Sequence, residues 1–154
     1  MSAAELVRRL INKEWMIAIA ESCTGGMVSA AITEIAGSSA VLDRGFVTYS
    51  NTAKVEMLGV PHELILAHGA VSAHVARAMA DGALKNSNAN IAVAVTGIAG
   101  PGGGTQSKPV GLVHFACATV DNTVHLEMRY GDLGRSGIRV AAVNSALQLA
   151  LDCV

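Results

Sequence analysis

Hydrophobic residues along the chain fall into stripes at helical spacing and into short unbroken apolar runs. A stripe that follows the capping box Ser2-Ala3-Ala4-Glu5 predicts a helix over about residues 3–13. Unbroken apolar runs predict strands at about residues 15–21 and 91–95, and such runs are typical of strands buried on both faces of a parallel sheet. The chain therefore combines amphipathic helices with central strands.

The same patterns predict the remaining elements. Expected strands lie at about 43–49, 110–119 and 123–130, and expected helices at about 27–35, 61–68, 73–85 and 135–151, with a further short helix that carries Lys54. The short connection between the last two strands predicts an antiparallel hairpin. This order predicts an α/β fold, a three-layer α/β/α sandwich with a mixed, mostly parallel sheet of about five strands. We expect residues 1–154 to form a single domain.

Composition narrows the function classes. Hydrophobic residues make up 51% of the chain and charged residues 15%, so we expect surplus apolar surface to be buried in a homo-oligomer, such as a dimer. A net charge of −1 and an aromatic content of 3% argue against nucleic-acid binding. No apolar run reaches the roughly 20 residues that span a bilayer, and the N-terminus lacks a signal pattern. We therefore expect no membrane partner and a cytoplasmic location.

Cysteine and histidine usage gives no sign of a cofactor. The cysteines Cys23, Cys117 and Cys153 are an odd number at wide spacing, which argues against a disulfide framework. The five histidines are scattered, and no pair of residues has the spacing of metal ligands. We expect neither a metal nor another cofactor.

The stretch Ala20-Glu21-Ser22-Cys23-Thr24-Gly25-Gly26 joins an expected strand to an expected helix. Such a junction gathers free backbone N–H groups, and its glycines allow a ligand to approach closely. Ser22 and Cys23 place two candidate nucleophiles there. Tyr49 and Thr96 end other strands, and open α/β sheets bind ligands outside the carboxyl ends of their strands. The pattern predicts a small-molecule site, with an ordinary capped turn as the alternative interpretation.

Several segments, taken together and in order, resemble the CinA C-terminal domain family. They are Glu21-Ser22-Cys23-Thr24-Gly25-Gly26, Gly37-Ser38-Ser39, Tyr49-Ser50-Asn51-Thr52-Ala53-Lys54, His68-Gly69-Ala70-Val71-Ser72, Val95-Thr96-Gly97-Ile98-Ala99-Gly100-Pro101-Gly102-Gly103-Gly104-Thr105 and Lys108-Pro109-Val110-Gly111. The resemblance covers nearly the whole chain and implies a three-layer α/β/α fold in a stand-alone, single-domain form. It also implies a nicotinamide-nucleotide amidohydrolase, which hydrolyses nicotinamide mononucleotide (NMN) to nicotinate mononucleotide and ammonia in pyridine-nucleotide recycling. A Ser/Lys catalytic pair and no metal are implied as well.

The resemblance assigns roles to individual residues. Ser22 matches the nucleophile and Lys54 its general base, while Ser39 matches another family serine that is either the nucleophile itself or a proton bridge between Ser22 and Lys54. Tyr49 and Thr96 match residues that orient the substrate or stabilise the oxyanion. The position of Cys23 beside Ser22 makes it an alternative nucleophile, although a small buried neighbour is the favoured interpretation.

The expected substrate-binding residues are Thr24, Gly25, Gly26, Thr96, Gly97 and Arg135. Arg135 resembles a family arginine that follows a Gly-Asp pair and holds the substrate phosphate bidentately. This sequence has two additional residues before that arginine, so Arg139 is the alternative phosphate ligand.

Two other functions fit the same residues. One is a non-catalytic nucleotide-binding module, in which Lys54 stays protonated. The other is an interaction module associated with competence or DNA damage, as the family name suggests. Release of ammonia distinguishes the enzyme from the nucleotide-binding module, whereas the interaction module requires a large exposed patch and a partner retained in pull-downs.

Overall fold

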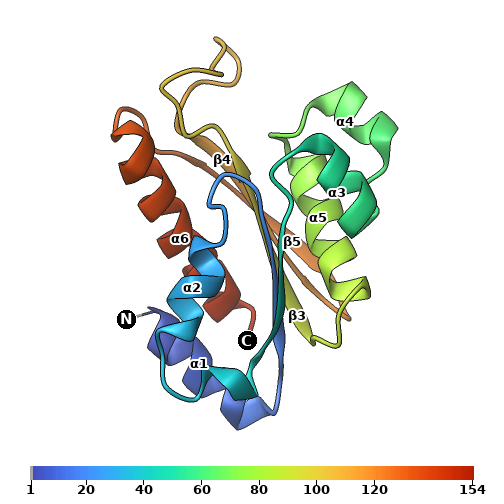
Figure 1. Cartoon of the computed structure of the whole chain (residues 1–154), viewed down its shortest axis with the longest axis vertical. Helices are drawn as coiled ribbons and strands as arrows, with labels where there is room; N and C mark the ends of the chain where they lie inside the picture. Colours follow the sequence, from blue (N-terminus) through green and yellow to red (C-terminus); the bar gives the residue numbers. More distant parts are fainter. Residues whose placement is uncertain (1) are drawn as a thin grey trace.

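Five strands form one sheet in the order β2-β1-β3-β4-β5 (Figure 1). In the computed structural model, which describes residues 2–154, the strands are β1 (Ile17–Glu21), β2 (Leu42–Val47), β3 (Ile91–Gly97), β4 (Leu112–Thr119) and β5 (Thr123–Arg129). Strand β1 pairs in parallel with β2 and β3, whereas β4 is antiparallel to both β3 and β5. Only β4 runs against the common direction, so the predicted mixed, mostly parallel sheet is confirmed.

Helices cover both faces of this sheet (Figure 1). One layer contains α1 (Ser2–Lys13), α2 (Met27–Thr33) and α6 (Gly134–Asp152); the other contains α3 (Asn51–Leu58), α4 (His62–His68) and α5 (Ala73–Lys85). A short 3-10 turn, η1 (Ser38–Ala40), precedes β2. The predicted α/β/α sandwich is confirmed, and Met1 is the one residue of the predicted 1–154 domain that lies outside the described part. None of the described helices has the length and apolarity needed to cross a membrane.

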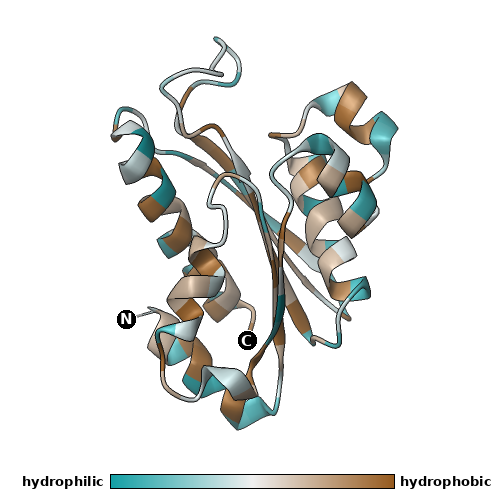
Figure 2. Cartoon of the chain, in the orientation of Figure 1, coloured by the Kyte–Doolittle hydropathy of each residue, from teal (hydrophilic) through white to brown (hydrophobic). Residues whose placement is uncertain are grey.

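Side-chain size differs between the two faces of the central strands. Residues such as Ile17, Ile19 and Val93 point toward the α1–α2–α6 layer, and alanines such as Ala20 and Ala94 point toward α5. Small alanines let α5 pack close to the sheet. The hydropathy colouring in Figure 2 shows apolar residues along these strands, and the two cores hold the helices against the sheet from both sides.

Parallel strands deliver their carboxyl ends to one edge of the sheet. Ser22 follows β1, Thr48 follows β2, and Gly97 ends β3 at that edge. Strand β2 ends at Val47, two residues earlier than the sequence pattern predicted. Beyond this end, the carbonyls of Thr48 and Tyr49 accept hydrogen bonds from a lysine side chain instead of a strand partner.

Candidate active site

A pocket of about 280 Å³ opens at the carboxyl edge of the parallel strands. Its lining residues come from the three strand ends, the start of α3 and the glycine-rich loop after β3. They are Ser22, Cys23, Tyr49, Asn51, Lys54, Ala70, Val71, Thr96, Gly97, Ile98, Ala99, Gly100, Gly102, Gly103 and Arg135. The predicted convergence of strand ends on one small-molecule pocket is therefore present in the fold.

Ser22 and Lys54 meet inside this pocket. The N–H of Ser22 donates to the carbonyl of Val95 at 3.0 Å, which holds the turn after β1 against β3. Lys54 lies in the first turn of α3, where the Ser50 hydroxyl accepts from the Ala53 N–H and caps the helix. The Nζ atom of Lys54 lies 3.0 Å from the Oγ atom of Ser22, which is within hydrogen-bond distance.

Burial changes the protonation equilibrium of the Lys54 side chain. The residue is 1% exposed, and its Nζ donates to the carbonyls of Thr48 and Tyr49 at 3.0 and 3.3 Å. Desolvation lowers the pKa of the Lys54 ammonium below its ordinary value, because burial disfavours the charged form. Within residues 2–154 no carboxylate forms an ion pair with Lys54 that would oppose this shift.

Cys23, next to Ser22, is a poor nucleophile. Burial raises the pKa of its thiol to about 11, so the sulfur stays protonated at neutral pH. A thiolate at Cys23 would raise the pKa of Lys54, but the thiol carries no charge. This favours Cys23 as a packing neighbour, as the sequence suggested.

The turn after β1 is fixed by the fully buried carboxylate of Glu21. Its oxygens accept from the Thr24 hydroxyl at 2.7 Å and from the Val28 N–H at 2.9 Å, and the Ser29 N–H and hydroxyl donate at 3.0 and 2.9 Å. Val28 and Ser29 belong to the first turn of α2, so an internal carboxylate already occupies the start of this helix.

This arrangement changes the expected roles of three predicted substrate-binding residues. Thr24 points its hydroxyl at Glu21, and neither Gly25 nor Gly26 lines the pocket. The two glycines have φ values of +58° and +111°, a conformation that lets the chain turn sharply from strand to helix. They shape the nucleophile's turn, and the structure gives no support for substrate binding at this helix end.

Two backbone N–H groups beside Ser22 have no carbonyl partner in the described part of the chain. Within residues 2–154, the N–H groups of Cys23 and Thr24 donate to no carbonyl, whereas the Gly25 N–H donates to the Ser22 carbonyl at 3.1 Å. Free N–H groups next to a nucleophile are the usual donors of an oxyanion hole.

The two candidate arginines occupy different positions. Arg135 lines the pocket mouth, where its guanidinium donates to the Gly100 carbonyl at 2.7 Å and to the Tyr49 hydroxyl at 3.1 Å. Arg139 lies behind the turn and donates to the carbonyls of Cys23 and Thr24 at 3.0 and 3.4 Å. Of the two, only Arg135 is placed to meet a ligand in the pocket.

Tyr49, Thr96 and Gly97 also border the pocket, as predicted. The Tyr49 side chain is 61% exposed at the mouth, so its hydroxyl lies at the rim beside Arg135. The Thr96 hydroxyl donates to the Ala70 carbonyl at 2.9 Å and ties the loop before α5 to the end of β3. A Cβ at Gly97 would lie 2.6 Å from the Val113 side chain, so no larger residue fits there.

Ser39 is not part of this site, which corrects the expectation that it acts as nucleophile or proton bridge. It lies exposed in η1, before β2, whereas the pocket lies beyond the other end of that strand. The six residues of β2 separate the two ends by roughly 20 Å at about 3.3 Å per residue. Ser39 is therefore too far from Ser22 and Lys54 to exchange a proton with either.

The structure adds residues that the sequence did not single out. Asn51, Val71 and Ile98 line the pocket, and the Thr48 carbonyl orients Lys54. Asn51 could have been suspected, since it lies one turn before Lys54 in the same short helix. The hydrogen bond to the Thr48 carbonyl could not have been predicted, because every residue has a main-chain carbonyl whatever its side chain.

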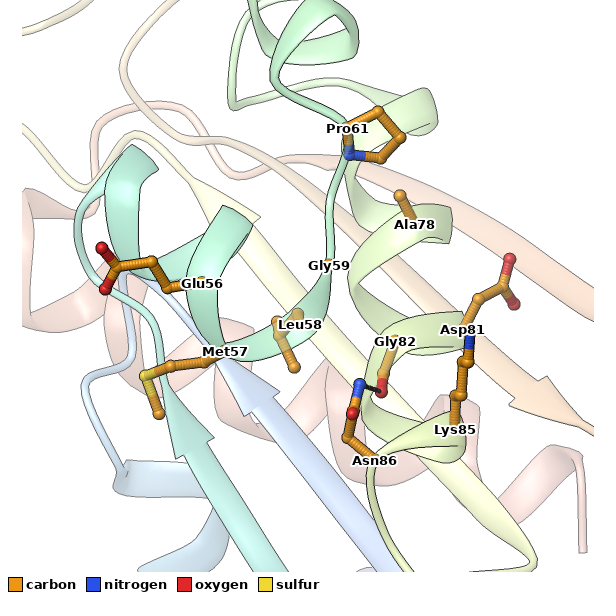
Figure 3. A pocket seen from close by; sticks show the side chains of 10 residues that line it. All are labelled: Glu56, Met57, Leu58, Gly59, Pro61, Ala78, Asp81, Gly82, Lys85 and Asn86. Carbon is orange, nitrogen blue, oxygen red and sulfur yellow. Dashed lines mark hydrogen bonds between the residues drawn. The ribbon is translucent and has the colours of Figure 1, made fainter.

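A larger hollow of about 440 Å³ lies between the end of α3 and α5 (Figure 3). Its polar side chains, among them Glu56, Asp81 and Lys85, lie along an open surface groove, and Asn86 bonds back to the Gly82 carbonyl. It holds no serine or cysteine beside a base. The described part of the chain also contains no cluster of three His, Cys, Asp or Glu side chains that could hold a metal ion.

Known proteins resemble this chain in sequence and in fold. Residues 1–154 match the profile of the family described as the CinA C-terminal domain. The chain is 48% identical to the nicotinamide-nucleotide amidohydrolase PncC of Enterobacter agglomerans, over 97% of this chain and 91% of that protein. It is 51% identical to a CinA-like protein of Synechococcus over 96% of this chain, but it spans only 36% of that protein's length.

Several other curated relatives are similarly long, and the chain spans 27–35% of their length. Among solved structures, the competence/damage inducible protein CihA from Agrobacterium tumefaciens is 57% identical and superimposes with a TM-score of 0.91. That comparison covers 99% of this chain and 96% of the other. Fold, motif order and sequence similarity agree over the whole length, and the chain belongs to the CinA C-terminal domain family.

Proposed function

We propose that this protein is a Ser/Lys amidohydrolase that converts NMN to nicotinate mononucleotide and ammonia. The observation that carries the proposal is the 3.0 Å contact between the Ser22 hydroxyl and the buried amine of Lys54, beside two unpartnered N–H groups. The name of the similar E. agglomerans protein, nicotinamide-nucleotide amidohydrolase, supports the substrate. The reaction supplies nicotinate mononucleotide, which we place in pyridine-nucleotide recycling.

The surroundings of Lys54 explain how it serves as a base. A neutral amine has two N–H donors and one lone pair. The carbonyls of Thr48 and Tyr49 accept the two N–H donors, which leaves the lone pair directed at the Ser22 hydroxyl. Burial favours this neutral form, and the hydroxyl of Ser22 then donates its proton to Nζ.

Acylation follows from that geometry. Ser22 Oγ attacks the carboxamide carbon while its proton passes to Lys54, and the amide oxygen becomes an oxyanion held by the N–H groups of Cys23 and Thr24. The intermediate collapses as the C–N bond breaks, and the Lys54 ammonium returns the proton to the departing nitrogen. Ammonia leaves, and the pyridine carboxyl group remains as an ester on Ser22.

Deacylation repeats the same steps with water. Lys54 removes a proton from a water molecule, the hydroxide attacks the ester carbon, and the Ser22 oxygen leaves with the proton from Lys54. The products are nicotinate mononucleotide and the free enzyme, so the protein ends as it began.

Arg135 is the proposed phosphate ligand. Its guanidinium already crosses the pocket mouth between Tyr49 and Gly100, and a substrate phosphate can replace these neutral acceptors. A charged contact of this kind contributes roughly 1.5–3 kcal/mol, which corresponds to about a ten- to hundredfold preference for NMN over nicotinamide riboside. Arg135→Gln should remove most of this preference and leave the rate with the riboside nearly unchanged.

An ammonia-release assay on NMN, nicotinamide riboside and nicotinamide tests the function. Wild-type protein should act best on NMN, and Ser22→Ala should abolish release, whereas the exposed serine variant Ser39→Ala should remain active. If the wild type binds NMN without releasing ammonia, the protein is a nucleotide-binding module instead. Activity that survives Ser22→Ala and disappears in Ser39→Ala would reverse the assignment of the nucleophile.

A further inference from the structure

One side chain of the active-site pocket has a polar group that the protein itself does not use. The pocket-lining side chains whose oxygen or nitrogen atoms are hydrogen-bonded within the protein are Ser22, Tyr49, Lys54, Thr96 and Arg135. Asn51 also lines the pocket, but its side-chain amide bonds to no other group within residues 2–154. This amide is therefore available to a ligand.

The amide of Asn51 is not needed by the helix that carries it. Asn51 is the first residue of α3, and the cap of this helix is Ser50, whose hydroxyl accepts from the Ala53 N–H at 3.0 Å. Asparagine is a less favourable helix residue than alanine, because its side chain competes for backbone hydrogen bonds. Helix formation therefore does not explain an asparagine at this position, whereas a ligand in the pocket does.

Asn51 lies one helical turn from the reacting groups, toward the open rim of the pocket. Residues three apart in a helix share one face, with about 5–6 Å between their Cβ atoms, so Asn51 and Lys54 border the pocket from the same face of α3. Lys54 is 1% exposed, whereas Asn51 is exposed. A substrate whose carboxamide reaches Ser22 therefore passes Asn51 before it meets Arg135 at the mouth.

We propose that Asn51 binds the ribose hydroxyls of the nucleotide substrate, an inference that rests on the proposed hydrolysis of NMN. In NMN the ribose lies between the phosphate and the pyridine ring that carries the carboxamide, and Asn51 has the corresponding place in the pocket. A side-chain amide both donates and accepts hydrogen bonds, as a hydroxyl does, whereas a phosphate mainly accepts them. Asn51 thus positions the substrate by its sugar and takes no part in the bond changes at the carboxamide.

Substitution of Asn51 tests this role with two substrates. Asn51→Ala should lower kcat/KM for both NMN and nicotinamide riboside by about three- to tenfold, chiefly through KM, because both compounds carry the ribose. A loss confined to NMN would identify a phosphate contact instead and would overturn the proposal, as would an unchanged kcat/KM. Thr52→Ala, an exposed neighbour that does not line the pocket, is the matched control and should behave like the wild type.

An NMN analogue without the two ribose hydroxyls separates a direct contact from a structural role. The wild type should act on this analogue about three- to tenfold less efficiently than on NMN, because the same hydrogen bonds are missing. Asn51→Ala should lose nothing further on the analogue, since the variant and the analogue remove the same contact. An equal loss on NMN and on the analogue would show that Asn51 acts on the shape of the pocket, which contradicts the proposal.

Failure of this inference can be told apart from failure of the proposed function. If the wild type releases ammonia but Asn51→Ala is as efficient as the wild type, only the ribose contact is wrong. If the wild type releases no ammonia, calorimetric titration with NMN and the analogue replaces the assay. Tighter binding of NMN than of the analogue, by the wild type and not by Asn51→Ala, would then support the contact. Equal binding of the two compounds by the wild type, or no binding of NMN, would overturn it.

Discussion

Lys54 owes its proposed role to its surroundings. Lys85 lies exposed on α5, whereas Lys54 is buried with its amine between two carbonyls and the Ser22 hydroxyl. The same type of side chain is thus exposed to solvent in one place and enclosed beside a hydroxyl in the other. Burial lowers the pKa of the Lys54 ammonium below its ordinary value, and the proposed role of Lys54 as a base depends on this shift.

A pH profile measures that property. Only the neutral amine accepts the Ser22 proton, so kcat/KM for ammonia release should be low in acid and should rise with pH through the lowered pKa of Lys54. The midpoint should lie below the ordinary lysine value of 10.5. Lys54→Arg, which keeps its charge throughout, should be inactive at every pH. A rise centred at 10.5 or above would contradict the role of burial.

At the scale of elements, the junction between β1 and α2 depends on Glu21. Its carboxylate accepts four hydrogen bonds from the turn and from the first turn of α2, and it stabilises the helix end that carries partial positive charge. Glu21 thereby fixes the direction in which Ser22 leaves the sheet. We expect this contact to contribute both stability and geometry.

Glu21→Gln tests the contribution to stability. The amide offers one acceptor oxygen instead of two, and its NH₂ group would face backbone N–H donors, so we expect a loss of about 2–4 kcal/mol in the free energy of unfolding. Glu34→Gln, at the exposed other end of α2, is the matched control and should change stability by less than about 0.5 kcal/mol. Equal midpoints for the two variants in urea unfolding would show that Glu21 is not the anchor of this junction.

The elements themselves were predictable because hydrophobic periodicity decides them. The ends of the parallel strands could be located in the sequence. Ser22, Thr96 and Lys54 were therefore expected at the same edge of the sheet, and all three line one pocket there. Ser39 was misplaced because it precedes its strand, and residues before a parallel strand lie at the opposite edge. The capping by Glu21 was missed, although its position two residues after Ile19 already places it on the α2 face of β1.

At the scale of the whole molecule, a histidine pair links stability to pH. His114 Nδ1 and His125 Nε2 lie 2.8 Å apart on neighbouring strands β4 and β5. Burial is the main cause that lowers the pKa of both side chains; His125 adds to the shift of His114 and Arg77 to that of His125, while Glu127 opposes both shifts. The folded protein therefore favours the neutral pair more strongly than the unfolded chain does.

This pair predicts acid sensitivity in a defined range. The pKa values of the two histidines are lower in the folded protein than the value of about 6.5 in the unfolded chain, so protonation favours unfolding. The folded state is therefore most stable above pH 6.5 and loses stability as the pH falls below that value. The melting temperature should drop between pH 7.5 and 5. His114→Gln should flatten that slope, whereas the exposed variant His62→Gln should leave it unchanged. If the melting temperature of His114→Gln depended on pH as steeply as that of the wild type, the histidine pair would not be the cause of the acid sensitivity.

The expected homo-oligomer stays a prediction. Val47 and Val140 are among the apolar side chains left exposed on the described surface, at 48% and 52%. Light scattering on the purified protein measures the assembly directly.

A double-mutant cycle on kcat/KM for NMN tests the central claim most directly, that Ser22 and Lys54 act as one catalytic unit. Because the proton passes between them, Ser22→Ala and Lys54→Ala should each reduce kcat/KM by on the order of a thousandfold, and the double variant should lose little more than either. Lys85→Ala is the matched lysine control and should retain full activity. A near-normal rate in Lys54→Ala, or losses that multiply in the double variant, would contradict the Ser/Lys mechanism.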